Sequence, residues 1–468
     1  MLFSELRFFV FFAVVLYLYW SLKSNWNRKI WLLICSYFFY GSWDWRFLSL
    51  IIISTFVNYR IGRDIGRYDE HKQRKQLLLI GICFNLALLG FFKYFNFFTE
   101  SAVSFAQILG ISLNYNTLQI LLPLGISFYT FESISYIVDV FSKKLTASDK
   151  LLNFALFIAF FPKLIAGPII RPNDFLPQLN QQRFLVNVDL RGCLVLFMAG
   201  FFKKAILSDN LSPFVDAYFK NPSTYNTWSA WVAVLFYAVQ IYCDFSGYSD
   251  MAIASAGLLG YKLPENFNAP YFSSNITEFW RRWHISLSTW LKDYLFIPLG
   301  GSRGSKLFTY RNLTLTMVLG GLWHGASWNF VIWGFMHGLA LILQKEWVQI
   351  SKFSSLLTTM SKLLGTALTF YWVCIAWIFF RAVDFATAFE VVKAFVFFQS
   401  SGTNEFQLPG ITLFVVLTIL HWIAYKKLLR QWWRSLPTPV FAAAFGVLVA
   451  FAIALLPMSS QPFIYFQF

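Results

Sequence analysis

The sequence predicts an all-α, polytopic membrane protein, and three observations support this class. Of the 468 residues, 57% are hydrophobic and only 13% are charged, whereas a soluble domain carries about 25% charged residues. Apolar segments follow one another with short polar breaks, and most are long enough for a span of about 20 residues. The 19 Trp and 22 Tyr residues suit the headgroup boundary, where a ring can be half apolar and half wet.

The net charge of +16 has two explanations, nucleic acid binding or cytoplasmic loops. In a chain this apolar, basic residues mark cytoplasmic loops, so we expect no nucleic acid partner and a lipid bilayer around the protein. The five cysteines are scattered and form no C-x-x-C pair. Neither a metal site nor a disulfide framework is therefore indicated.

The first apolar segment lacks a small-residue cleavage site and is expected to be a retained span rather than a removed signal peptide. Together with re-entrant pieces, we expect about 10–12 helices in all. The candidate segments are residues 2–20, 30–57, 77–98, 118–141, 151–170, 190–207, 228–243, 313–343, 364–380, 386–398, 411–425 and 440–456.

The segment 30–57 is interrupted by Gly-Ser-Trp-Asp-Trp-Arg at 41–46, which leaves halves of 11 residues each. Each half is too short to cross a bilayer alone. Basic residues flank the segment on both sides, at 23–29 and 60–75, so both flanks should be cytoplasmic. A broken hairpin that does not fully cross satisfies both conditions, and such breaks occur where helices line a cavity or are buried in protein.

The informative region is 242–333. An apolar run ends in Asp, Ser, Gly, Tyr, Ser and Asp at 244–250, and a turn-rich stretch follows at 263–271. We treat residues 1–468 as one integral membrane domain, in which the region at about 242–345 holds most of the candidate functional residues.

Residues 278–294 have the pattern of an amphipathic helix lying at a membrane interface. At helical spacing one stripe is apolar and the charged side chains lie largely off it. The stripe consists of Trp280, Trp283, Leu287, Trp290 and Leu291, and the charged residues are Arg281, Arg282, Lys292 and Asp293.

His324 lies inside a strongly apolar span, in the run 319–329. An ionisable group at that depth is costly and points to a functional role, and imidazole can accept a proton from a hydroxyl near neutral pH. The glycines on either side would let a substrate approach closely. A buried histidine held by one or two hydrogen bonds explains the same position equally well.

His284 is the second candidate, although a histidine among lipid headgroups fits it too. His337 follows His324 by 13 positions (337 − 324). On an unbroken helix this spacing turns it about 220° away from His324, which favours a role in helix packing. Asp244 and Glu132 are acids near apolar spans, and each could orient a histidine, bind a polar substrate or belong to hydrogen-bonded structure.

Several signatures are missing from the sequence. It contains no Walker A motif, no H-E-x-x-H zinc helix and no Gly-x-Ser-x-Gly nucleophile elbow. An ATP-driven pump and a serine hydrolase are therefore poorly supported.

Taken together, these motifs resemble the membrane-bound O-acyltransferase family, in particular its alginate O-acetylation branch. The resemblance extends along essentially the whole chain, and the pair W-x-x-W-H-x-S-L-S and L-W-H-G is its most specific part. The stretches that carry it are 161–169, 244–250, 266–271, 279–288, 320–328 and 462–466.

The resemblance implies a ring of helices around a thin centre, with funnels from both faces. It implies that His324 and His284 are catalytic, that acetyl-CoA is the donor with no bound cofactor, and that a separate extracytoplasmic partner protein and a polysaccharide receive the acetyl group. It also implies a bacterial inner membrane location. Expected substrate contacts are Asp244, Trp323, Trp280, Arg281, Arg282, Lys292, Ser327 and Asn329.

The basic residues near 281–306 could bind the phosphates of coenzyme A through charge-assisted hydrogen bonds, although cytoplasmic loop charge explains them nearly as well. Three other functions remain open from the residues. The chain could be a transporter or channel for a polysaccharide or acyl carrier, or a scaffold whose partner does the chemistry. It could also be an enzyme of the same class that transfers D-alanine to teichoic acid or acylates a lipid or sterol.

Overall fold

The computed structural model describes residues 1–112, 118, 120–351, 358–406, 410–426, 432–457 and 461–464. Their regular structure is helical, and the one pairing of extended chain within these ranges is an isolated bridge between Tyr225 and Asn404. The predicted all-α class is thus confirmed. By internal contacts the chain divides into two compact units, one of Met1–Cys193 with Ala252–Pro264 and one of Leu194–Met251 with Glu265–Phe468. The single domain over 1–468 stays a prediction.

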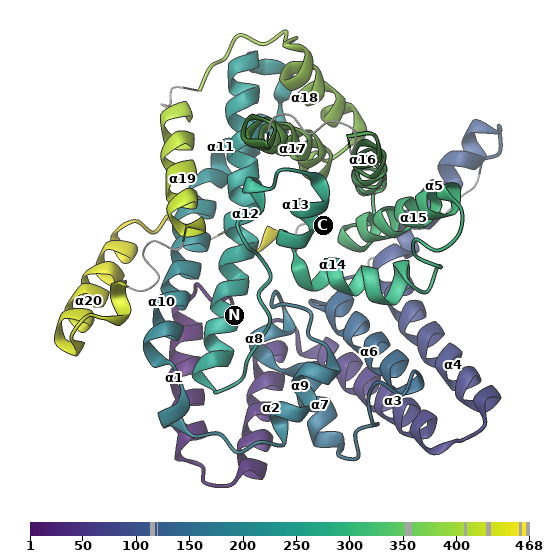
Figure 1. The fold of residues 1–468 in the computed structure, drawn as a ribbon, viewed down its shortest axis with the longest axis vertical. Helices are drawn as coiled ribbons and strands as arrows, with labels where there is room; N and C mark the ends of the chain where they lie inside the picture. The colour runs from purple at the N-terminus through teal and green to yellow at the C-terminus, as the bar shows by residue number, and fades with distance from the viewer. Residues whose placement is uncertain are drawn as a thin grey trace. The chain divides into compact units, whose positions relative to one another are not determined.

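The first unit is a set of packed helices, in which α3, α4 and α6 lie against one another (Figure 1). Its elements are α1 (Leu6–Ser21), α2 (Asn25–Gly41), η1 (Trp45–Phe47), α3 (Leu48–Arg67), α4 (His71–Leu89), η2 (Gly90–Tyr94), α5 (Phe95–Ile108), α6 (Ile126–Phe141), α7 (Leu151–Ala159), α8 (Phe161–Leu164), α9 (Pro172–Leu179) and η3 (Leu185–Asn187).

The break predicted near residues 41–46 is present between α2 and α3, but the two halves are longer than the expected 11 residues. Helix α2 has 17 residues and α3 has 20. The sequence pattern stopped at polar residues that the helices in fact include. Lys29 is buried in α2 because its ammonium group donates to Asn153 Oδ1 at 2.8 Å, and a buried charge is tolerated when it is hydrogen-bonded.

A buried ion pair lies between α6 and α8. Lys163 pairs with Glu132, and both side chains are almost fully buried. Glu132 also accepts a hydrogen bond from the Ile170 backbone N–H at 3.2 Å. Both oxygens of this carboxylate are therefore committed to the protein, which favours the structural alternative for Glu132.

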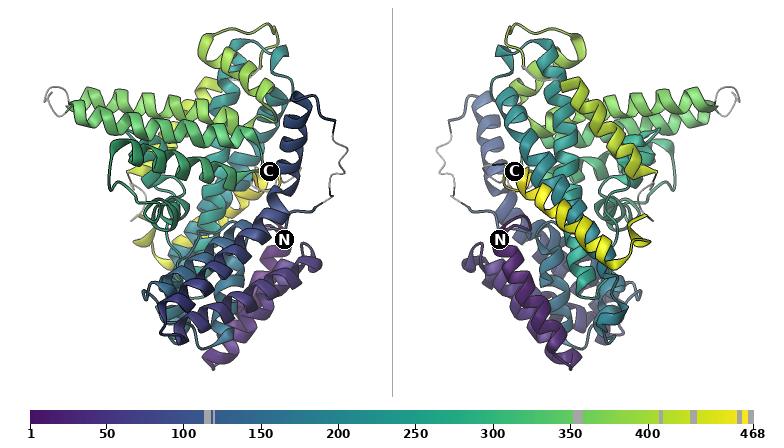
Figure 2. Two further views of the ribbon diagram at one scale, coloured as in Figure 1. Left: turned by 90° about the vertical axis from the view of Figure 1, so that its right-hand side faces the viewer. Right: turned by 90° about the vertical axis from the view of Figure 1, so that its left-hand side faces the viewer.

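The second unit holds both candidate histidines. Helices α16 and α17 run side by side in both views of Figure 2. The elements are α10 (Leu190–Phe201), η4 (Phe202–Ser208), α11 (Asp209–Lys220), η5 (Pro222–Thr224), α12 (Thr227–Leu258), η6 (Pro270–Phe272), α13 (Ile276–Arg282), α14 (Ile285–Leu291), η7 (Lys292–Phe296), α15 (Lys306–His324), α16 (Trp328–Ser351), α17 (Thr358–Arg381), α18 (Phe385–Phe397), α19 (Gly410–Tyr425), η8 (Trp432–Arg434) and α20 (Thr438–Ala454), where α10 and α12 each have residues in both units.

Three predicted boundaries in the second unit are wrong. The run 228–243 does not end at its acids, because α12 continues to Leu258. The run 313–343 is two helices, α15 and α16, separated at 325–327. The amphipathic stretch 278–294 is broken at His284 into α13 and α14 (Figure 1). For α12 and for the α13–α14 break, residues distant in sequence supply contacts at the boundary, from Lys203 and Lys204 in the first case and from Asn266 in the second.

Within the described residues, three helical stretches have the length and apolar composition to cross a membrane. They are His71–Ile108, Thr227–Leu258 and Lys362–Arg381, and shorter apolar helices cover Leu6–Ser21, Thr412–Ile423 and Thr438–Ala454. The chain is an integral membrane protein that crosses more than once.

Candidate active site

His284 lies at the junction of α13 and α14, where its backbone is left-handed, with φ 41° and ψ 55°. A non-glycine residue there needs support from its surroundings, and the segment before α13 supplies it. The backbone N–H of Ile285 donates to the carbonyl of Asn266 at 2.9 Å. The hydroxyl of Ser286 donates to Asn266 Oδ1 at 2.9 Å, and Asn266 Nδ2 donates to Ser249 Oγ at 3.2 Å.

The imidazole of His284 is fully buried in a wall of aromatic rings. Its centroid lies 4.5 Å from that of Phe245 and 5.9 Å from that of Trp323. Neither ring nitrogen has a hydrogen-bond partner among the described residues. Because buried polar atoms normally have partners, these two nitrogens are available to a substrate or an ordered water.

His324 is the last residue of α15, and its side chain is 3% exposed. Its ring packs against Trp333 at 4.9 Å and Phe380 at 5.2 Å between centroids. The rings of His324 and His284 lie 6.3 Å apart. The structure thus brings together the two histidines that the sequence singled out.

The glycines beside His324 make room for neighbouring protein atoms rather than for a substrate. A Cβ on Gly321 would lie 2.1 Å from the carbonyl oxygen of Phe330, and a Cβ on Gly325 would lie 2.0 Å from its ring. Both positions are small so that α15 and α16 can pack closely. The expectation that they admit a substrate is therefore wrong.

His337 was expected to point away from His324 on an unbroken helix, but the break at 325–327 removes that argument. Its fully buried ring lies 4.7 Å from Trp333, which also contacts His324. It lies 5.1 Å from Trp280, and neither nitrogen has a partner among the described residues. The Trp333 ring is therefore in contact with both histidines.

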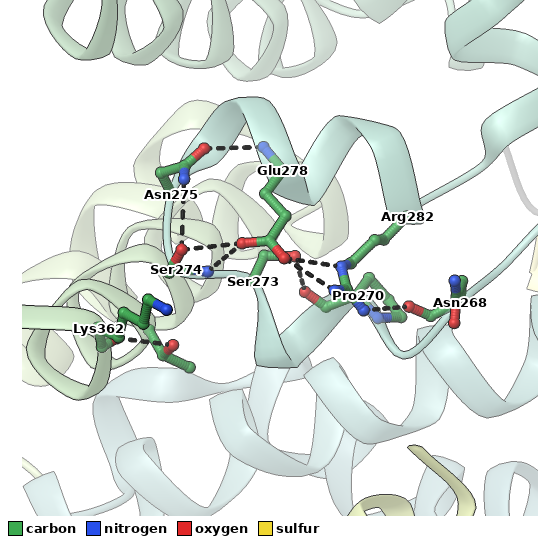
Figure 3. Close-up of polar contacts among 9 residues, drawn as sticks. Asn268, Pro270, Ser273, Ser274, Asn275, Glu278, Arg282 and Lys362 are labelled. Carbon is green, nitrogen blue, oxygen red and sulfur yellow. Dashed lines mark hydrogen bonds and ion pairs between the residues drawn. The ribbon is translucent and has the colours of Figure 1, made fainter. Parts of the chain in front are cut away.

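A polar network holds α13 in place (Figure 3). The Glu278 carboxylate accepts hydrogen bonds from the backbone N–H and hydroxyl of Ser274 at 2.8 and 2.9 Å and pairs with Arg282 at 2.8 Å. Arg282 also donates to the carbonyl of Asn268 at 3.2 Å. Burial alone would raise the pKa of Glu278, but the Ser274 hydrogen bonds and the Arg282 charge outweigh it and hold this pKa below its usual range.

The remaining predicted contacts on and near α13, α15 and α16 divide into two groups. Trp323 lies 5.1 Å from His324 between ring centroids, and Trp280 lies 5.8 Å from Trp333. Ser327 and Asn329 instead start α16. The Ser327 hydroxyl accepts from the Asn329 N–H at 3.3 Å, and the Asn329 amide donates to the carbonyl of Ala382 at 2.9 Å.

The predicted basic residues on α13 and η7 differ in how far they are exposed. Arg281 is exposed. The Lys292 side chain is 60% exposed and reaches Asp293 at 3.5 Å. Arg282 is engaged by Glu278 and Asn268, so among these three residues Arg281 and Lys292 have the head groups accessible to a ligand.

Asp244 is buried and fully engaged by protein. One oxygen lies 2.6 Å from Lys204 Nζ, and the other accepts the Ile464 N–H at 2.8 Å. Nothing in the sequence pointed to Lys204, or to Phe245, Trp333 and Phe380, whose rings contact the histidines. Aromatic content was visible in the sequence, but it is high throughout the chain and singles out no residue.

Comparison with known proteins agrees with this architecture. Residues 140–383 match the membrane-bound O-acyltransferase (MBOAT) family. The chain is 41% identical to the probable alginate O-acetylase AlgI of Pseudomonas putida, over 99% of both chains. It is 43% identical to the Pseudomonas aeruginosa protein of that name, over 92% of this chain and 82% of the relative. It is 38% identical to the peptidoglycan O-acetyltransferase of Helicobacter pylori, over 79% and 73% respectively.

The helical membrane architecture and these comparisons define the class as a multi-pass membrane enzyme. The chain belongs to the membrane-bound O-acyltransferase family. The transporter and scaffold alternatives are therefore set aside.

Proposed function

We propose that this acyltransferase moves an acetyl group from cytoplasmic acetyl-CoA to an extracytoplasmic hydroxyl. The hydroxyl belongs to a serine of a partner protein, to an exopolysaccharide such as alginate, or to both in sequence. The observation that carries the proposal is the pair of buried imidazoles, His284 and His324, with ring centroids 6.3 Å apart. Relatives named for acetyl transfer to alginate and peptidoglycan support a polysaccharide acceptor.

In the proposed mechanism, a ring nitrogen of His324 accepts the proton of the attacking hydroxyl. The hydroxyl oxygen bonds to the thioester carbonyl carbon, and the bond from that carbon to sulfur breaks. The thiolate leaves as coenzyme A after it receives the proton from His324. A positioned histidine in this role contributes about 10²–10⁴-fold to the rate.

His284 supports the same step from 6.3 Å away. Its ring nitrogens have no partner among the described residues, so one of them can donate to the carbonyl oxygen or to the departing sulfur. The surrounding rings of Phe245, Trp323 and Phe380 exclude water, which would otherwise hydrolyse the thioester.

In this proposal the phosphates of acetyl-CoA bind outside the ring of aromatic side chains around the histidines. Arg281 and Lys292 have exposed head groups, and charge-assisted hydrogen bonds to phosphate suit both. Arg282 is committed to Glu278, so its substitution should alter α13 rather than weaken donor binding alone.

The decisive experiment uses purified protein in lipid nanodiscs with radiolabelled acetyl-CoA. Wild type is compared with His324→Ala and His284→Asn, with and without an extracytoplasmic acceptor protein. Asn is chosen at position 284 because it tolerates left-handed backbone. His421→Ala is the matched control, because its ring packs on Phe272 and Tyr242 instead.

We expect release of coenzyme A by wild type and by His421→Ala, and none by His324→Ala. Equal turnover by His324→Ala would overturn its role. If the wild type releases no coenzyme A from acetyl-CoA but turns over a D-alanyl thioester, the proposed activity becomes D-alanyl transfer in place of acetyl transfer.

A further inference from the structure

A second buried cluster lies in the same unit as the histidines and has no part in the proposed chemistry. Lys204, on η4, lies between two carboxylates. Its ammonium nitrogen is 2.8 Å from Asp209 Oδ1 and 2.6 Å from Asp244 Oδ1, and all three side chains are almost fully buried. One cation between two anions leaves this cluster one negative charge in excess.

The segment 461–464 supplies backbone N–H groups that stabilise this excess negative charge. Ile464 donates its backbone N–H to the second oxygen of Asp244 at 2.8 Å, and Gln461 donates its own to Asp209 Oδ2 at 3.4 Å. Lys204 donates in turn to the carbonyl of Gln461 at 3.1 Å. Removing one partner of a buried charge is strongly unfavourable, so the cluster and the segment hold each other in place.

The segment also inserts a ring towards the active site. Phe463 is fully buried, and its ring lies 4.6 Å from Tyr248 and 5.6 Å from Phe245 between centroids. The Phe245 ring also lies 4.5 Å from the His284 ring between centroids. A series of edge-on ring contacts therefore leads from the charged cluster through Phe463 and Phe245 to the imidazole.

We infer that the Lys204–Asp209–Asp244 cluster anchors the segment 461–464, and that Asp244 and Phe463 are positioning residues for His284. Asp244 acts by fixing Phe463, which supports Phe245 and so the orientation of the His284 ring. The inference rests on the proposed role of His284. It assigns Asp244 a task other than substrate binding.

A neighbouring pair provides a matched control. Lys203 pairs with Asp250 on the same two elements, η4 and α12, but these side chains are 22% and 24% exposed. Lys203 also donates to Ser246 Oγ at 3.1 Å. Asp250→Asn removes the same charge from the same helix as Asp244→Asn.

The kinetic test compares these two variants with Phe463→Ala and Phe463→Leu in nanodiscs. We expect kcat of Asp244→Asn and Phe463→Ala to fall by about 10- to 100-fold, as for a misplaced catalytic group, with KM for acetyl-CoA nearly unchanged. Phe463→Leu should recover much of the loss because it refills the space. Asp250→Asn should stay within about 2-fold of wild type.

A second measurement does not depend on activity. Hydrogen exchange of the amides at 461–464 and the rate of diethyl pyrocarbonate modification of His284 should both rise in Asp244→Asn, and in Asp250→Asn neither should change. Unchanged exchange and unchanged kcat in Asp244→Asn would overturn the inference. If Asp244→Asn does not fold, the Phe463→Ala variant provides the test. A normal rate of His284 modification together with a normal kcat in Phe463→Ala would reject the positioning role.

The two proposals fail in different ways. Full activity of His284→Asn rejects the proposed role of His284, and the exchange data then still decide whether the cluster anchors the segment. Loss of activity in His284→Asn with normal kcat in both Asp244→Asn and Phe463→Ala rejects the positioning role alone.

Discussion

A buried carboxylate of the first unit and two buried imidazoles of the second differ in whether the protein supplies their hydrogen-bond partners. In the first, the Glu132 carboxylate is held by Lys163 and by the Ile170 N–H. In the second, His284 and His337 are as deeply buried, yet no ring nitrogen of either has a partner among the described residues. A satisfied buried charge contributes to the fold, whereas an unsatisfied buried imidazole is retained at a cost. The comparison teaches that missing partners, rather than burial, mark the groups available for chemistry.

The largest expected effect separates catalysis from folding. His324→Ala should lower turnover by about 10²–10⁴-fold or more, because the proton acceptor is removed. Its melting temperature in nanodiscs should stay near that of wild type. If His324→Ala loses activity only in proportion to its folded fraction, His324 is a structural residue. The comparison between the buried carboxylate and the buried imidazoles then fails.

The opposite pattern is expected in the first unit. Glu132→Gln leaves Lys163 buried without its counter-ion and should cost about 3–5 kcal/mol of stability. Turnover per folded molecule should remain near wild type, as measured by activity against the amount of monodisperse protein. The double variant Glu132→Leu with Lys163→Met should recover stability, since replacing both partners by apolar groups is nearly neutral. Failure of that recovery would show a role beyond the ion pair.

A smaller effect tests whether His337 takes part in the reaction as His324 is proposed to do. His337→Phe removes a polar ring without partners among the described residues and should change stability by about 1 kcal/mol in the favourable direction or not at all. Thermal unfolding and single-turnover acetyl transfer measure the two consequences. If activity falls as far as in His324→Ala, His337 belongs to the proton path.

The smallest effect concerns Glu278. Its pKa in the folded protein is held below the usual value of about 4.3, so its stabilising contribution is complete above that value and is lost as pH falls through the lowered pKa. The melting temperature of Glu278→Gln should therefore lie below wild type at pH 7, and the gap should close in acid. A gap independent of pH would assign the loss to packing.

The class predicted from the sequence is confirmed, and the two histidines that it singled out lie together in the structure, whereas several predicted helix boundaries are wrong. A low content of charged residues and long apolar runs indicate that lipid surrounds the chain. Both can be read from the sequence alone. The position of His324 in an apolar run was conspicuous for the same reason. These inferences needed no knowledge of tertiary contacts.

The boundaries failed where distant residues decide them. Asp244 and Asp250 looked like the end of a span, but lysines at 203 and 204 pair with them and let α12 continue. The helical stripe over 278–294 gave no sign of the break at His284, which depends on hydrogen bonds to Asn266. His337 was misplaced because the turn at 325–327 could not be distinguished from an apolar helix interior.

The contact of α15 with α16 has a consequence for the order of events during synthesis. His324, Trp333 and their helices come from the consecutive stretch 306–351, so this hairpin can pair as soon as it has left the ribosome, because its contacts are local in sequence. Phe463 is translated 112 residues after the end of that hairpin (463 − 351). The packing of α15 against α16 at His324 can therefore form early, whereas Phe380 reaches His324 and Phe463 reaches Phe245 only later. Nascent chains that end before Phe463 have this hairpin formed but lack the contact that supports Phe245 and His284.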